Sequence, residues 1–304
     1  GCQPCMSEYG IPAYPFGLLP SWAQHLPLPL GLTTADGIIP VSPGYAQEIQ
    51  TPEFGCGLER LLQSRAKYIT GIVNGIDQTV WNPETDNWIT NSFNIETLHE
   101  KINNKKILVE GTGMEFNPTI PLLVVVSRMD YQKGIDLVVS CLQDMLDYPW
   151  QAIILGSGDS VIEQKCQIFA QVHPNRMRLI TGFHAELAHQ LYAGGDIFLM
   201  PSRYEPCGIS QMISMRYGTI PVARATGGLK DTILSTRPGK PGTGYLFDEA
   251  TSSSFAQALR FALQDFTDPD LWREIQRNAM KMDFSWDASA LKYIQQYANL
   301  VHNK

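Results

Sequence analysis

Hydrophobic positions alternate between strand-like and helix-like patterns from about residue 121 to residue 223. The first strand, 121–127, is a nearly continuous run of aliphatic residues, which indicates burial on both faces. Strands that alternate with helices predict a parallel, doubly wound α/β sheet. The expected strands are 121–127, 152–155, 176–181, 196–200 and 220–223, and the expected helices between them are 134–146, 161–172, 186–193 and 210–217.

The two ends of the chain follow other patterns. Residues 1–32 are rich in Pro, Gly and Leu and show little periodicity. Ser42 followed by Pro43 predicts a capped helix start, because serine oxygens accept from free N–H groups and proline suits the first turn. A strand is expected over 68–73. The other expected helices are 57–66, 95–103, 252–264, 269–280 and 287–301.

Composition and charge narrow the class of protein. The 304 residues, 44% of them hydrophobic, indicate an ordered globular chain of one large domain or about two domains. The net charge of −7 argues against a nucleic-acid partner, although a local basic pocket remains compatible with it. No apolar run reaches the roughly 18 residues of a membrane span, and no signal peptide is visible. The chain does not begin with Met, which suggests a trimmed or partial protein.

The cysteines do not predict a metal site. Cys2 and Cys5 form the only close pair, and no second pair or histidine follows at the spacing that zinc needs. We therefore expect reduced thiols and no bound metal.

Four polar segments directly follow predicted strands. In an open α/β sheet, ligands bind at the carboxyl ends of the strands, so these segments should converge there. They are 127–134, 156–159, 181–184 and 201–208.

Arg128 and Lys133 flank a short turn before a predicted helix. Two cations beside a helix N-terminus suit a diphosphate, since charge attraction, hydrogen bonds and free N–H groups act together. Solvated surface cations are the simpler explanation for an isolated pair, but the place after a buried strand favours a site. Glu205 is either an acid that meets sugar hydroxyls or transition-state charge, or an exposed loop residue.

Weaker candidates lie nearby. Gly156 and Gly158 suit a turn that admits a nucleotide, or equally a plain turn, and the third glycine of the dinucleotide motif is missing. Phe183 could stack on a base, although such aromatics more often belong to the core, and His184 could bridge phosphate or be structural. Other candidates begin predicted helices or allow close backbone approach, with a plain turn as the alternative for the last: Gly208, Ile209, Ser210 and Gly227.

Seven motifs together resemble the glycogen synthase and starch synthase family of bacteria and plastids. They occur in the family's order and cover the chain from about residue 34 to residue 300. The matching segments are GIVNGID (71–77), WNPETD (81–86), VSRMDYQKG (126–134), PSRYEPCG (201–208), YGTIPV (217–222), TGGLKDT (226–232) and DFSW (283–286).

The resemblance implies a two-lobed glycosyltransferase of the GT-B type, with a Rossmann-like sheet in each lobe. Residues 1–74 would be the last part of the N-terminal lobe, 75–286 the nucleotide-sugar-binding lobe, and 287–304 a helix that crosses back. The implied reaction transfers glucose from ADP-glucose to the non-reducing end of an α-1,4-glucan, with retention and without a metal or other cofactor. The implied setting is the bacterial cytoplasm or the plastid stroma, without nucleic-acid or membrane partners.

The resemblance also assigns roles by position. Arg128 and Lys133 match the pair that holds the departing diphosphate, and Glu205 matches the acid beside the donor glucose. Asn74 matches the hinge asparagine near the glucose, and Phe183 stands where the family has an aromatic over adenine. The remaining donor-site positions are Gly156, Gly158, His184, Cys207, Gly208, Ile209, Ser210, which replaces a threonine, and Gly227.

Two departures from the family pattern shape the expectation. No Lys-x-Gly-Gly-Leu segment precedes residue 34, so the chain is expected to be the donor-binding half of the enzyme, completed by a missing lobe or a partner chain. Ala225 replaces a basic residue that many relatives carry. The alternatives are a non-catalytic nucleotide- or glucan-binding remnant and an NAD-dependent enzyme, which the missing glycine disfavours. The choice between ADP-glucose and UDP-glucose stays open.

Overall fold

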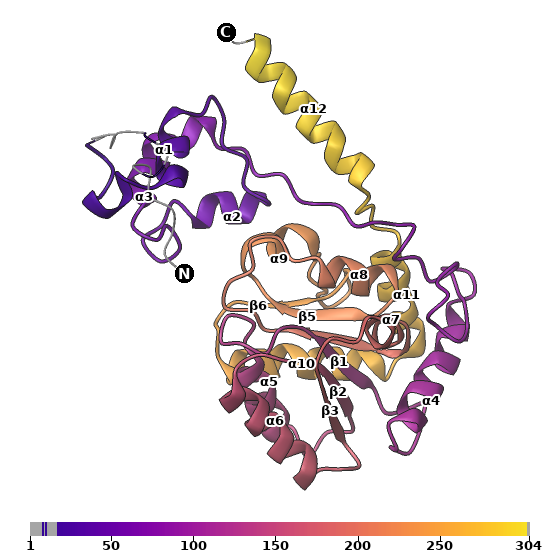
Figure 1. Ribbon diagram of the computed structural model, residues 1–304. Helices are drawn as coiled ribbons and strands as arrows, with labels where there is room; N and C mark the ends of the chain where they lie inside the picture. Colours follow the sequence, from indigo (N-terminus) through magenta and orange to yellow (C-terminus); the bar gives the residue numbers. More distant parts are fainter. Residues whose placement is uncertain (1–7, 9, 11–16, 303–304) are drawn as a thin grey trace.

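A six-stranded, wholly parallel sheet forms the centre of the molecule (Figure 1). The computed structural model describes residues 8, 10 and 17–302, so Cys2 and Cys5 lie outside the described residues. The strand order β3-β2-β1-β4-β5-β6 means that the chain reverses its direction of travel between β3 and β4. The strands are β1 (Leu122–Val126), β2 (Gln151–Gly156), β3 (Met177–Thr181), β4 (Ile197–Met200), β5 (Ile220–Arg224) and β6 (Tyr245–Phe247).

Helices cover both faces of this sheet, as the alternating pattern predicts (Figure 1). On one face α5, α6 and α10 pack beside one another, and on the other α7, α8 and α9 pack over β1, β4 and β5. The described helices are η2 (Ser21–Ala23), α1 (Pro27–Thr34), α2 (Pro43–Glu48), α3 (Glu59–Ser64), η3 (Ala66–Tyr68), η4 (Leu98–Glu100), α4 (Lys101–Gly111), α5 (Ile135–Gln143), α6 (Ser160–Val172), α7 (Ala185–Gly194), α8 (Ser210–Arg216), α9 (Gly227–Thr232), α10 (Ser252–Phe266), α11 (Pro269–Met280) and α12 (Trp286–His302).

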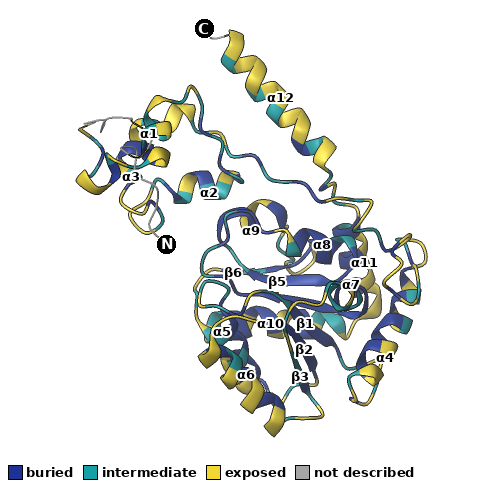
Figure 2. Ribbon diagram, viewed as in Figure 1, coloured by how far each residue is buried: buried dark blue, intermediate teal, exposed yellow. Residues whose placement is uncertain are grey.

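The aliphatic strands form the core. The side chains of Leu122, Leu123 and Val124 in β1 are wholly buried, and β1 pairs with β2 from Leu122↔Gln151 to Val126↔Leu155. Figure 2 shows the buried strands between helices whose outer faces are exposed. Burial of this apolar surface on both faces is the main source of stability for such a sheet.

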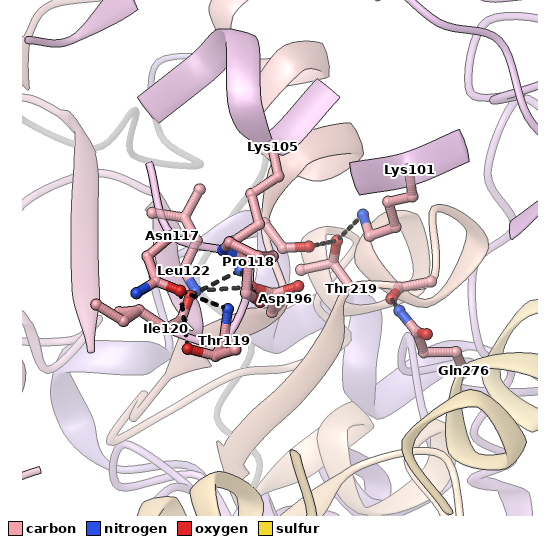
Figure 3. A network of polar contacts seen from close by, with 12 residues as sticks. Lys101, Lys105, Asn117, Pro118, Thr119, Ile120, Leu122, Asp196, Thr219 and Gln276 are labelled. Carbon is pink, nitrogen blue, oxygen red and sulfur yellow. Dashed lines mark hydrogen bonds and ion pairs between the residues drawn. The ribbon is translucent and has the colours of Figure 1, made fainter. Parts of the chain in front are cut away.

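A buried polar network ties α4 to the amino ends of the strands (Figure 3). The Lys105 ammonium lies 2.7 Å from Asp196 Oδ2, which also accepts from the backbone N–H of Leu122. The Lys101 ammonium donates to Thr219 Oγ1 and to the carbonyls of Tyr192 and Ala193. A cavity of about 450 Å³ opens beside these lysines, but protein acceptors take up their ammonium protons, so the network is structural.

The segment before residue 74 contacts the sheet domain through α2. Ser42 Oγ accepts from the backbone N–H of Tyr45 at 3.0 Å, which confirms the predicted cap. The same hydroxyl donates to the carbonyl of Pro206 at 2.6 Å. The backbone N–H of Gly44 donates to Asp231 in α9 at 2.7 Å. Helix α2 is therefore fixed against α9 and the loop that follows β4.

The final helix, α12, leaves the sheet domain and runs beside the N-terminal segment (Figure 1). Ser289 Oγ donates to the carbonyl of Val73, and the Leu300 side chain lies against Gly37. One face of α12 is exposed and apolar: Leu291, Ile294, Tyr297 and Val301. Among the described residues, no helix has the length and apolar character needed to cross a membrane.

Some expected elements differ from the structure. The predicted strand over 68–73 is wrong: its start belongs to η3, and the segment forms an isolated bridge between Ile38 and Ile69, followed by a single backbone bond from the Ile72 N–H to the Pro40 carbonyl. Pro40, opposite this segment, has no N–H to extend the ladder. The helix expected over 95–103 begins as η4 and continues as α4 to residue 111. Helices α1 and α9 and strand β6 were not predicted.

Candidate functional site

Two loops meet at the carboxyl ends of β1 and β4, the point where the strand order reverses. The Lys133 ammonium, from the loop after β1, lies 2.5 Å from Glu205 Oε2, in the loop after β4. Both side chains are largely buried. The buried Ser202 hydroxyl donates to the same carboxylate oxygen at 3.0 Å. The prediction that the basic segment and the acidic loop converge is therefore confirmed.

Arg128 differs from Lys133 in its surroundings. Its side chain is 67% exposed and pairs with Asp130 of the same loop, Nη1 to Oδ2, at 2.9 Å. Exposed ion pairs of this kind contribute little and exchange readily with other partners. Arg128 is thus accessible to an anionic ligand, whereas Lys133 already has a carboxylate partner.

Several of the predicted glycines are needed by the loops themselves. Gly227 has φ +44°, and a Cβ there would overlap the Glu205 carbonyl. A Cβ at Gly156 would overlap the Ser127 carbonyl, and one at Gly158 would crowd the Met129 backbone. These glycines let the loops approach one another, so their presence does not depend on a bound ligand.

The segment after β3 stands at the same end of the sheet, two strands away from β1. Phe183 is 93% exposed, which rules out the core alternative. The His184 ring nitrogen Nε2 lies 3.3 Å from the Thr181 carbonyl, within the same turn. Phe183 and His184 therefore border the open face of the site, without direct contact to the Lys133–Glu205 pair in the described hydrogen bonds and ion pairs.

The remaining predicted residues surround the start of α8. The backbone of Asn74 lies near the Cys207 thiol, whose pKa is raised by burial. Gly208 has φ +71°, and Ile209 is partly exposed. The Ser210 hydroxyl lies near the Tyr192 phenol, whose pKa burial raises to about 12. Ser210 also lines a cavity of about 20 Å³ beside Lys133, enough room for one water molecule.

Sequence reasoning missed three contributors to this site. Glu48 Oε1, from α2, accepts from the Thr226 hydroxyl at 2.9 Å and from the Gly227 N–H at 2.7 Å. The Tyr204 hydroxyl donates to that of Tyr45 at 2.7 Å, and burial, then this contact, raises the pKa of Tyr204. Arg203 joins the two loops. Only its place within PSRYEPCG, beside Glu205, pointed to Arg203, and nothing in the sequence pointed to Glu48.

Metal ligands are not grouped in the part of the chain that the structure describes. No set of three or more His, Cys, Asp or Glu side chains is placed there to hold an ion.

Comparison with known proteins places this geometry in context. The family profile described as "Glycosyl transferases group 1" matches residues 114–282, and that described as "Starch synthase catalytic domain" matches 6–64. Glycogen synthase 1 of Methylococcus capsulatus is 43% identical over 271 residues, which are 88% of this chain and 55% of the relative. Glycogen synthase of Nitrosomonas eutropha is 43% identical over 278 residues, with 90% and 55% coverage. The chain thus spans about 55% of these relatives.

Solved structures agree with the same placement. The catalytic domain of starch synthase IV from Arabidopsis thaliana, bound to ADP and acarbose, has a TM-score of 0.84 and 35% identity. The match covers 90% of this chain and 58% of that one. Sucrose-phosphate synthase from Thermosynechococcus elongatus, at 19% identity and a TM-score of 0.62, shares the fold. Both the resemblance to glycogen and starch synthases and the GT-B type of α/β fold are confirmed. Since the first profile covers more than half of the chain, the chain belongs to the group 1 glycosyl transferases.

Proposed function

We propose that this chain carries the donor-binding lobe of a retaining glucosyltransferase that adds glucose from ADP-glucose to the non-reducing end of an α-1,4-glucan. Its relatives are glycogen synthases, and the starch synthase that it resembles was solved with ADP and acarbose. The observation that carries the proposal is the Lys133–Glu205 pair at the carboxyl ends of β1 and β4. The bacterial cytoplasm or the plastid stroma is the proposed setting.

The proposed chemistry follows from these charges. As the bond between the anomeric carbon and the diphosphate oxygen breaks, ADP leaves with the electron pair. The glucan hydroxyl oxygen bonds to the anomeric carbon in its place, and the hydroxyl proton passes to an oxygen of the departing diphosphate. Arg128, exposed beside the site, and Lys133 stabilise the negative charge on the departing diphosphate. We propose that these side chains supply the countercharge without a resident metal or other cofactor.

Glu205 has a complementary part in the proposal. With the donor absent, its carboxylate balances Lys133. When a diphosphate binds, it competes for the Lys133 ammonium, and the carboxylate can then accept hydrogen bonds from sugar hydroxyls or face positive charge at the anomeric carbon. Ser202 holds the carboxylate in place during this exchange.

We propose that the rest of the enzyme docks on α12 and the segment before residue 74. The chain spans about 55% of its relatives, and α12 has an exposed apolar face of the kind that marks protein interfaces. In this arrangement the acceptor glucan enters from the docked lobe. The occupant is either a further segment of the same protein or a separate partner chain.

A binding titration tests the donor site. We expect the chain to bind ADP by calorimetry, with UDP as the competing nucleotide, and Arg128→Ala to weaken binding about tenfold or more, as loss of a charged contact does. Arg277→Ala, on the exposed face of α11, is the matched control and should leave the affinity unchanged. Failure of the unsubstituted chain to bind ADP at millimolar concentration would reject the proposal.

The alternative is a non-catalytic nucleotide- or glucan-binding protein that acts with a partner, and the exposed face of α12 favours a partner in either case. Addition of the N-terminal lobe of a relative, with ADP-glucose and a short glucan, separates the two. Chain elongation supports the enzyme, whereas ADP binding without elongation in the assembled complex supports the alternative.

A further inference from the structure

The loops after β1 and β4 are held together at their backbones. The N–H of Arg203 donates to the Gln132 carbonyl at 2.8 Å, and Gln132 Nε2 donates to the Tyr204 carbonyl at 3.1 Å. These bonds join residues about seventy positions apart in the sequence. They place Arg203 directly beside the turn that carries Lys133.

The Arg203 side chain binds residues that precede and follow Lys133 in that turn. Its two terminal nitrogens donate to the two oxygens of Asp136, at 2.8 and 2.7 Å, and Nη1 also donates to the Tyr131 carbonyl at 2.8 Å. The guanidinium lies 3.6 Å from the centre of the Tyr131 ring. A bidentate ion pair between a guanidinium and a carboxylate, with the guanidinium stacked on an aromatic ring, is a contact that lysine cannot reproduce.

The surroundings make this a firm contact. The Arg203 side chain is 17% exposed and that of Asp136 is 27% exposed. Burial alone would raise the pKa of Asp136, but the hydrogen bonds and charge of Arg203 hold it below its usual value. The guanidinium of Arg224, the last residue of β5, donates to the Arg203 carbonyl at 2.5 Å, so a neighbouring strand supports the same residue.

Three of the five N–H groups of the Arg203 guanidinium are engaged by Tyr131 and Asp136, which commits this side chain to the contact between the loops. Resting on the function proposed above, we infer that Arg203 is a positioning residue. Its clamp on Tyr131 and Asp136 holds the Lys133 turn against the Glu205 loop and sets the distance between Lys133 and Glu205.

The test compares the unsubstituted whole chain with two variants. Arg203→Lys keeps the positive charge but loses the bidentate contact, and Asp136→Asn is the second variant. Arg176→Lys is the matched control, because Arg176 also lies over an aromatic ring, Trp150, and donates to a carbonyl, that of Tyr148, ahead of β3. Backbone hydrogen exchange is measured in peptides covering 129–134 and 203–206. ADP affinity is measured with and without Lys133→Ala.

We expect Arg203→Lys and Asp136→Asn to speed exchange in those two loops alone, and Arg176→Lys to leave both loops unchanged. ADP affinity should fall about tenfold in Arg203→Lys, and by much less when Lys133→Ala is already present, since coupled residues are not additive. Unchanged exchange in both loops overturns the inference, as does an equal loss of affinity with and without Lys133. If the unsubstituted chain binds no ADP, the proposed function fails, but the exchange comparison still decides the positioning role.

Discussion

Single residues fix how closely the loops of the candidate site approach one another. Gly227 has a positive φ and lies directly against the Glu205 carbonyl. The fold therefore requires both the conformational freedom of glycine and the absence of a side chain at this position. The Gly227 N–H also donates to Glu48, which belongs to α2. The Glu205 loop and the N-terminal segment therefore meet at one glycine.

We expect Gly227→Ala to lower the free energy of unfolding by roughly 2–4 kcal/mol, because strain at positive φ adds to the overlap with the Glu205 carbonyl. Gly239→Ala is the matched control, since Gly239 has φ +71° and open space around it. Denaturant unfolding of both variants separates the two effects. Equal losses of stability would show that the overlap contributes nothing.

The residues that sequence analysis found and missed differ in one respect. Arg128, Lys133 and Glu205 stand directly after predicted strands, where topology alone indicates a ligand site. The partners of Arg203 and Glu48 lie 67 and 178 or more positions away, and no local pattern encodes such pairing. The roles assigned to individual donor-site residues stay predictions.

At the scale of elements, α4 carries two buried lysines of its own, Lys101 and Lys105. Burial lowers the pKa of Lys101 to about 7, and the attraction of Asp196 only partly offsets this effect. In the unfolded chain a lysine titrates near pH 10.4. Between these values the unfolded state binds more protons at this residue, so stability should rise with pH.

We therefore expect the free energy of unfolding to increase between pH 7 and pH 8, by at most about 1.4 kcal/mol per pH unit from this group. Lys101→Met should remove that increase, and Lys292→Met, exposed on α12, should retain it. Denaturant unfolding at several pH values provides the measurement. The thiols of Cys141, Cys166 and Cys207, whose pKa values are raised by burial, act in the opposite direction from about pH 8.5. The buried tyrosines with raised pKa values do so only near pH 10 and above. A slope that persists in Lys101→Met would contradict this assignment.

Elements with strong periodicity were the easiest to predict. Helix α11 runs from Pro269 to Met280, as its proline start and apolar spacing predicted, and β1 to β5 lie within one or two residues of their expected bounds. The segment 68–73 has strand-like residues but only a single bridge to another segment within the described part of the chain. A strand needs a partner as well as a composition, and the partner is not visible locally.

The whole molecule presents an apolar face on α12. Leu291, Ile294, Tyr297 and Val301 recur every three or four residues and are 56 to 70% exposed. Such a stripe favours association with another surface. The family resemblance implies a terminal helix that crosses back, which stays a prediction, and α12 contacts Val73 and Gly37 of the N-terminal segment.

We expect Leu291→Gln combined with Ile294→Gln to reduce self-association of the chain in sedimentation velocity at high concentration. The unfolding temperature should change little, because these side chains are mostly exposed to solvent. Lys292→Gln, on the same helix turn, should leave self-association as it is. If the double substitution left self-association unchanged, the surface responsible for it would lie outside this face of α12.

The reversal of strand order has a consequence for synthesis on the ribosome. Strand β4 pairs with β1 and not with β3, which precedes it, so one side of the aliphatic β1 lacks its partner until residue 200 has been made. Lys133 and Glu205 are 72 residues apart, an interval on the order of ten seconds at typical translation speeds. During that interval one edge of β1 is unpaired and Lys133 lacks its carboxylate partner. The nascent chain is then most prone to associate with other chains through the exposed strand edge.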